Sequence, residues 1–455
     1  MTSEPLSITP PSTAPRPAPA AHALPVTGQA IPHFPLIASH FAVGFGWALL
    51  GGAGLIVIAP TLAGGTFLDS RVLAVTHLFT LGCLTTVITG VLYQIFPAML
   101  GIGERSRRVA WLSLGLMALG TALLVVGLLL GQRAAQGLGW LALFAAVFGT
   151  AWNLLPQRRK APRNHQLGLY VSYAHMNFGL AILVAGVRIG DAFGWWSTPR
   201  LGLISAHLHL ALVGFVTLTT FGLGSRMIPM FFGSRSPIPA WYDRAMPRLV
   251  ATGVMGYAAG TIAAIPLVVA GGIAAMAAAG VLFCWLGLRW FRTRARRVLD
   301  PATAFLTLAL TSLATAIPLG LVAAATGLRH PGVPLAYVVA LMLGWAVTLM
   351  LGVSLRVLPT LTWQHRFASR IGRPGTPTMP MMLHAGLGWT ALAAASAGLP
   401  ALVGGLLTAS PVTVRSGAVL FALAITATAV HHVRMMLIGR VRPAHDQHPH
   451  HPVVQ

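Results

Sequence analysis

Long apolar stretches alternate with short polar or Pro/Gly-rich breaks along almost the whole chain. A helix needs about 20 apolar residues to cross roughly 30 Å of hydrocarbon. Twelve stretches have about that length: 36–61, 71–98, 109–131, 138–155, 166–187, 200–230, 248–268, 270–290, 301–325, 333–358, 380–406 and 414–438. The pattern predicts an all-α polytopic membrane protein with about twelve transmembrane helices. The short loop between the seventh and eighth helices is expected around Pro266 to Gly272.

The composition agrees with this class, because 56% of the residues are hydrophobic and only 8% are charged. Soluble domains carry roughly 25% charged residues. The two cysteines, Cys83 and Cys284, both fall in apolar stretches. Neither a disulfide framework nor a CxxC metal site is therefore available, and redox chemistry would need a bound cofactor.

The net charge of +23 is distributed unevenly between the loops. Basic residues are dense in alternate loops, as at 105–108, 158–163 and 292–297, and sparse in the loops between them. By the positive-inside rule, this asymmetry places both termini in the cytoplasm of a bacterial-type inner membrane. We expect the arginines to set topology and to contact anionic lipid in the bilayer, and we expect no nucleic-acid partner.

Both ends of the chain have low complexity. Residues 1–35 are rich in Pro and Ala and have no uninterrupted apolar core of a cleavable signal, so a disordered cytoplasmic arm is expected. The twelve-helix membrane domain is assigned to 36–440. The His-rich tail 441–455 contains HDQHPHHP and is read as a solvated cytoplasmic segment.

An internal repeat relates the second, sixth and tenth stretches. Residues 76–101, THLFTLGCLTTVITGVLYQIFPAMLG, align with 208–233, LHLALVGFVTLTTFGLGSRMIPMFFG. The matched positions, offset by 132, include His77/His209, Gly82/Gly214, Gly90/Gly222 and Pro97/Pro229. In the tenth stretch Gly344, Gly352 and Pro359 keep the spacing with an offset of 130, and Val339 stands at the histidine position. A repeat every four helices predicts three four-helix units around a pseudo-threefold axis.

A shorter echo is the pattern H-x-x-x-G, which starts at His40 in the first stretch and at His175 in the fifth. With helices alternately up and down, both histidines lie in the cytoplasmic half, as do His384, His431 and His432. We regard these five as candidates for a second haem or metal site. Carbonyl or lipid-phosphate hydrogen bonds are the alternative role for each of them.

The histidines of the repeat share one depth on the opposite side. At 1.5 Å per residue, His77 lies about 8 Å inside the outer boundary, and His207 and His209 lie about 9–12 Å inside it. Residues two apart on a helix differ by about 200° in direction, so His207 and His209 face different gaps. A polar ring at membrane depth usually marks function.

With twelve helices, three units and these histidines, the chain resembles subunit I of the haem–copper oxidases, including cbb3-type oxidases and nitric oxide reductases. The segment AHLHLALVGF is similar to the H-x-H with which that family holds two haems, and His77 matches its second-helix haem ligand. NnrS-type haem membrane proteins are a related possibility. The chain departs from the family because its H-x-H is on the sixth helix, and because the seventh, eighth and tenth stretches contain no histidine.

The resemblance implies a haem-binding redox protein, an oxidase-like or nitric oxide reductase-like oxidoreductase, with b-type haem. We expect His77 and His209 to be the axial ligands of a low-spin haem, and His207 to face the gap toward the tenth helix as ligand of an open haem. These three residues leave no tri-histidine copper site, so copper is left open. A cytochrome c-type or quinol donor and O2 or NO are the expected partners. The alternative function is a transporter or channel that passes protons, copper or haem along intramembrane histidines, and a noncatalytic scaffold is the third.

Overall fold

The computed structural model describes residues 33–160, 165–198, 200–295 and 297–438, and throughout these ranges the chain is helical without a strand. The prediction of an all-α polytopic membrane protein is confirmed. Eleven of the described helical segments are long and apolar enough to span a membrane. The predicted arm 1–35, apart from its last three residues, and the tail 441–455 lie outside the described residues.

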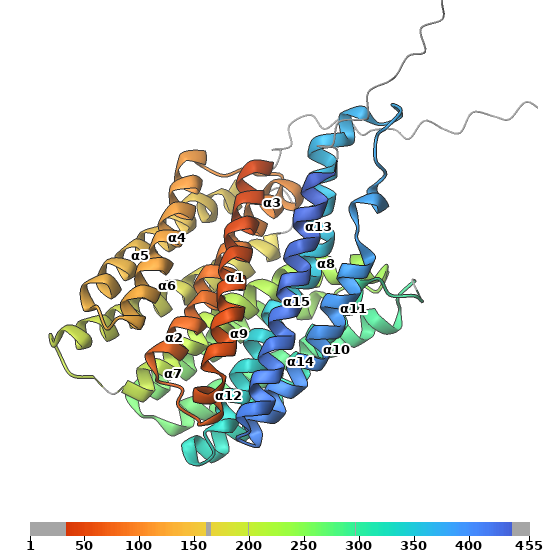
Figure 1. Ribbon diagram of the computed structural model, residues 1–455. Helices are drawn as coiled ribbons and strands as arrows, with labels where there is room; N and C mark the ends of the chain where they lie inside the picture. The colour runs from red at the N-terminus through yellow and green to blue at the C-terminus, as the bar shows by residue number, and fades with distance from the viewer. Residues whose placement is uncertain (1–32, 161–164, 199, 296, 439–455) are drawn as a thin grey trace, which may run out of the picture.

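Each of the twelve predicted stretches corresponds to one helical segment, and the segments form three consecutive units of four (Figure 1). The first unit comprises α1 (Phe34–Ala63), α2 (Ser70–His77), η1 (Leu78–Thr85), α3 (Thr86–Ile95), η2 (Phe96–Leu100), α4 (Arg107–Leu129), α5 (Arg133–Leu154) and η3 (Leu155–Lys160). The second comprises α6 (His165–Phe193), α7 (Arg200–Ala211), η4 (Leu212–Thr217), α8 (Leu218–Phe232), α9 (Ala240–Ala263) and α10 (Pro266–Arg292). The third comprises α11 (Pro301–Thr326), η5 (Gly327–Arg329), α12 (Gly332–Val339), η6 (Ala340–Val347), α13 (Thr348–Phe367), η7 (Ala368–Arg370), η8 (Met379–Met382), α14 (Ala385–Leu407) and α15 (Pro411–Leu437).

The three units close into a ring. Within each unit the last two helices form a hairpin, namely α4 with α5, α9 with α10, and α14 with α15. Between units, α5 packs on α6, α10 packs on α11, and α15 packs on α1. The second helix of each unit faces the centre, where η1, η4 and η6 contact one another. This arrangement is the pseudo-threefold architecture that the repeat predicts.

The central segments η1, η4 and η6 are π-helical, and they occupy corresponding places in the three repeats. A π turn forms hydrogen bonds between residues five apart and so holds more residues than an α turn. Threonine side chains fit this geometry at each segment: the hydroxyls of Thr85, Thr217 and Thr348 donate to the carbonyl five residues earlier, at 2.9, 2.9 and 2.8 Å. The hydropathy pattern does not predict these π segments.

Glycines seat the second helix of each unit on the first helix. A Cβ added at Gly90 would lie 2.5 Å from the Cβ of His40, and one at Gly222 would lie 2.6 Å from the Cβ of Tyr170. At Gly352 the neighbour is the Cβ of Phe305, at 2.5 Å. Contacts this short require that no side chain be present, so the glycines allow the helices to pack closely.

These contacts correct the shorter echo of the sequence. The residue of α6 that corresponds to His40 is Tyr170, because both pack against matched glycines of the repeat. His175 stands five residues later, so the H-x-x-x-G pattern of the first and fifth helices is out of register with the structural repeat. A five-residue motif with a single histidine was too short to fix the alignment.

The third helix of the second unit also differs from expectation. α9 begins at Ala240, eight residues before the predicted stretch, and it is the helix that falls outside the eleven candidate spans. Asp243 lies in its first turn and forms an ion pair with Arg226 of α8, whose Nη2 lies 2.8 and 2.7 Å from the two carboxylate oxygens. The break before α10 falls at 264–265 rather than at 266–272, because Ala264 adopts a left-handed conformation there.

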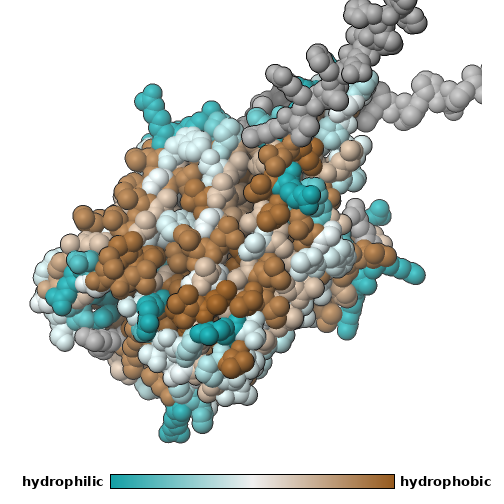
Figure 2. Space-filling view, viewed as in Figure 1, coloured by the Kyte–Doolittle hydropathy of each residue, from teal (hydrophilic) through white to brown (hydrophobic). Residues whose placement is uncertain are grey.

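The outer surface of the bundle is largely apolar (Figure 2). Large aliphatic side chains point outward from the middle of the helices, for example Val57, Leu119 and Val281, whose exposed fractions are 70%, 52% and 55%. An apolar surface of this extent on spanning helices is covered by lipid.

Candidate functional site

The end of the bundle where α2, α7 and α12 begin holds the histidines of the repeat. His77 of α2 and His207 of α7 face each other, with ring centroids 6.3 Å apart and planes inclined by 32°. The Nδ1 atom of His77 lies 2.7 Å from the Leu73 carbonyl, and that of His207 lies 2.9 Å from the Ala181 carbonyl. A carbonyl only accepts hydrogen bonds, so each Nδ1 carries the proton and each Nε2 has its lone pair free for a ligand.

His209 faces a different gap, between the second and third units. Its Nδ1 donates to the Ser205 carbonyl at 2.8 Å, and its Nε2 accepts from the hydroxyl of Tyr337 on α12 at 3.3 Å. The ring of Tyr257 on α9 lies on the other side, with centroids 4.3 Å apart. The Tyr257 hydroxyl shares a hydrogen bond of 2.7 Å with the hydroxyl of Ser205.

These two pairs are equivalent under the pseudo-threefold repeat. The offset of 130 that relates the second and third units takes His207 to Tyr337, so the pair His77/His207 in one gap corresponds to His209/Tyr337 in the next. In the remaining gap the corresponding residues are Val339 and Val75. The same positions thus carry His with His, His with Tyr, and Val with Val.

The repeat also explains why the predicted ligand pair is not brought together. The sequence suggested that His77 and His209 flank one site and that His207 faces the tenth helix. The structure places His207 beside His77, and His209 beside Tyr337 of that helix. Because His77 and His209 occupy equivalent positions, each faces the following unit, and so they cannot face each other.

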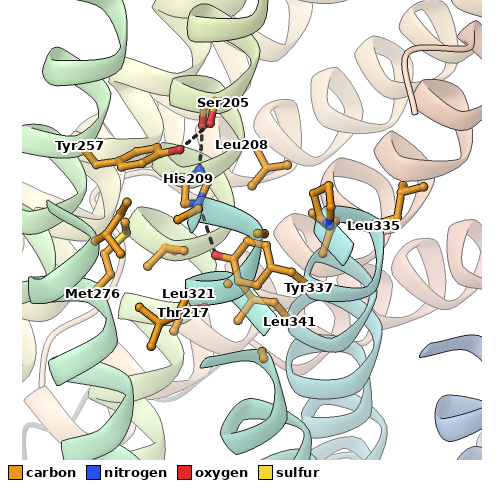
Figure 3. Close-up of a pocket in the computed structure, with 18 of the residues that line it drawn as sticks. Ser205, Leu208, His209, Thr217, Tyr257, Met276, Leu321, Leu335, Tyr337 and Leu341 are labelled. Atoms are coloured by element: carbon orange, nitrogen blue, oxygen red, sulfur yellow. Dashed lines mark hydrogen bonds between the residues drawn. The ribbon is translucent and has the colours of Figure 1, made fainter. Parts of the chain in front are cut away.

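A cavity of about 440 Å³ adjoins His209 (Figure 3). Four polar residues, Ser205, Tyr257, His209 and Tyr337, lie together and are linked by hydrogen bonds. Thr76 and Thr217 also line the cavity, and their hydroxyls donate to backbone carbonyls. The rest of the wall is mostly apolar and comes from α2, α7, α9, α10, α11 and α12, with residues such as Leu208, Met276, Leu321, Leu335 and Leu341. A pocket of a few hundred Å³ with few convergent polar groups is the usual form of a small-molecule site.

Sequence reasoning missed both tyrosines of this cavity. Tyr337 carried a usable signal, because it stands where His207 stands in the preceding repeat. Tyr257 carried none, since a lone tyrosine on α9 has no counterpart in the aligned segments.

The five second-site candidates divide into three places. His384, at the start of α14, lies 5.7 Å from His431 of α15 by ring centroids, and His431 lies 5.3 Å from His432. His432 is held by Ser354, whose hydroxyl lies 3.0 Å from its Nε2. His40 and His175 are apart from this cluster, and each has its Nδ1 on a carbonyl of its own helix, that of Leu36 or of Val171.

Among the described residues no three or more His, Cys, Asp or Glu side chains are arranged to hold a metal ion. In comparisons with known proteins, no family model matches the chain and no curated protein matches it.

Proposed function

We propose that the chain is a haem-binding membrane protein of the redox class, with His77 and His207 as axial ligands of one b-type haem between α2 and α7. The observation that carries the proposal is the facing pair of imidazoles at 6.3 Å. Two imidazoles on opposite sides of one iron have ring centroids roughly 6 Å apart, because each metal–nitrogen bond is about 2.0–2.1 Å. The pair therefore fits bis-imidazole ligation.

The surroundings of the two rings support the same role. Anchoring Nδ1 on a backbone carbonyl fixes the ring and leaves Nε2 as the donor, which is how metal-binding histidines are commonly oriented. His77 takes its anchor from α2 and His207 takes its anchor from α6, so the two rings are held by different helices. Haem iron supplies one-electron chemistry when bound, and the residues of this chain position it.

The partners and the orientation belong to the same proposal. A cytochrome c-type or quinol donor would supply electrons, and a gas such as O2 or NO would be the acceptor or the sensed ligand. Arginines such as Arg105, Arg107 and Arg294 lie at the end opposite the histidines. By the positive-inside rule this supports a bacterial-type inner membrane with the histidines in the outer half and both termini in the cytoplasm.

The test is an absorption spectrum of the purified protein with haem quantified per chain. We expect a Soret band and, on reduction, a sharp low-spin α band. His77→Ala and His207→Ala should each lose the low-spin signal, and added imidazole should restore part of it. His209→Ala is the matched control, since it lies on the same helix as His207 but faces another gap.

Three outcomes would overturn the proposal. A colourless protein from haem-replete cells would favour the transporter function instead. Full haem with an unchanged spectrum in both His77→Ala and His207→Ala would exclude these ligands. Loss of the low-spin signal in His209→Ala but not in His207→Ala would reassign the pair.

A further inference from the structure

The cavity beside His209 has chemistry of its own, which the haem proposal does not use. Its lining contains no Lys, Arg, Asp or Glu among the described residues. A haem carries two propionates and a fatty acid carries one carboxylate, and both need a cation or water for the charge. The cavity therefore suits a neutral ligand.

The hydrogen-bond inventory of the polar side leaves one donor and several acceptor sites. Ser205 and Tyr257 each have one O–H, and their mutual bond uses only one of the two, so one hydroxyl hydrogen is free to donate. Tyr337 donates to His209 and keeps the lone pairs of its oxygen. A ring hydroxyl meets a matching partner at both positions, and a ring carbonyl meets one at the Ser205/Tyr257 hydroxyls.

The apolar side of the cavity extends to the lipid-facing surface. Leu201 of α7 and Leu321 of α11 line the cavity and are also 51% and 46% exposed. Both lie in candidate membrane spans, Leu201 as the first residue of its span. The cavity thus offers an apolar tail a place beside these leucines and a polar ring a place beside His209.

We propose that this cavity binds a membrane-soluble quinone or quinol, with its ring oxygens between the Ser205/Tyr257 hydroxyls and the His209/Tyr337 pair. An oxygen of the quinone or quinol accepts the free O–H, and the second hydroxyl of a quinol donates to the oxygen of Tyr337. The site is separate from the His77/His207 pair, so the proposal does not depend on haem there.

The probe is decylubiquinone, a short-tailed benzoquinone, titrated into the purified full-length protein by calorimetry. We expect one saturable site per chain. Tyr257→Phe removes one hydrogen-bonding group and should weaken binding about fivefold to tenfold. Ala277→Phe fills the cavity from α10 and should weaken it more than fiftyfold. Tyr242→Phe is the matched control on α9, since Tyr242 is buried outside the cavity, and it should bind as the wild type does.

Thermal unfolding and haem content are measured on every variant, so that a misfolded protein is recognised. Absence of saturable binding would overturn the quinone proposal, as would wild-type affinity in a stably folded Ala277→Phe protein. Loss of haem from Ala277→Phe or Tyr257→Phe would also overturn it, because the cavity would then be a haem pocket. A colourless protein that binds the quinone would refute only the haem proposal.

Discussion

Alanine at Gly222 provides a quantitative test of how the central helices are packed. The new Cβ would lie 2.6 Å from Cβ and 2.8 Å from Cγ of Tyr170. Carbon atoms in contact prefer about 3.5–4.0 Å, so α8 and α6 must separate by roughly 1 Å. Tyr170 is completely buried, and the contact is with its Cβ and Cγ rather than with the far end of the side chain.

The expected magnitude combines two opposing effects. Overpacking a buried site costs about 1–3 kcal/mol. Alanine is a better helix former than glycine by about 1 kcal/mol. We therefore expect Gly222→Ala to lower the free energy of unfolding by about 1–2 kcal/mol.

The matched control is Gly256→Ala, a glycine within α9 that has no atom within 4 Å of its added Cβ. There only the helix-propensity gain of about 0.5–1 kcal/mol remains. The assay is thermal unfolding followed with a thiol-reactive dye, which reports exposure of the fully buried Cys83. The reasoning is refuted if Gly222→Ala unfolds at the same temperature as the wild type or higher, or if Gly256→Ala falls below it.

Three further predictions concern polar groups that hold the helix ends. Asp243→Asn leaves Arg226, whose side chain is only 10% exposed, without its counter-charge, and it should lower the free energy of unfolding by about 3–5 kcal/mol. In the same unfolding assay, the double variant Arg226→Met with Asp243→Leu should recover most of that loss. Asn153→Ala removes three hydrogen bonds, two to the N-cap residue of α4 and one to a tyrosine of α3, and should cost about 2–4 kcal/mol; a shift in unfolding temperature no larger than that of Gly256→Ala would contradict this. Hydrogen bonds from Arg71 hold the pKa of Asp69 below its ordinary value of 3.8, so this carboxylate stabilises the fold above that pH and the stabilisation is lost as the pH falls through the folded-state pKa. Asp69→Asn should therefore reduce the acid dependence of unfolding, and an unchanged pH profile would exclude the effect.

The helices were predictable because hydrophobic length and loop charge mark their ends directly. The three-unit plan was predictable from a repeat of glycines and prolines, which the close contacts of Gly90, Gly222 and Gly352 explain. The first helices of the first and second units, α1 and α6, were matched out of register from the sequence. The reason is that His40 and Tyr170 occupy equivalent places with different side chains. Because the two residues differ, a sequence alignment has no identical position to match there.

The facing direction of each histidine depended on information that hydropathy does not contain. The depth of His77, His207 and His209 follows from counting residues along straight helices. Their partners depend on the azimuth of each helix, which the π segments alter and which no apolar pattern reports. Because His77 faces His207 of the second unit in the structure, the repeat places His209 toward the third unit and not toward His77.

The π segments divide each central helix into two parts with different roles. Each one lies between the histidine position of its helix and the glycine that packs against the first helix of the unit, which is Gly90, Gly222 or Gly352. Removing one residue there would restore an α turn without rotating the outer part, because the wide π turn already takes up the extra residue. The outer part of each helix carries the side chains that line the gaps, and the inner part carries the glycine that packs against the neighbouring helix. One backbone geometry therefore serves three gaps, and a single pair of side chains in each sets its chemistry.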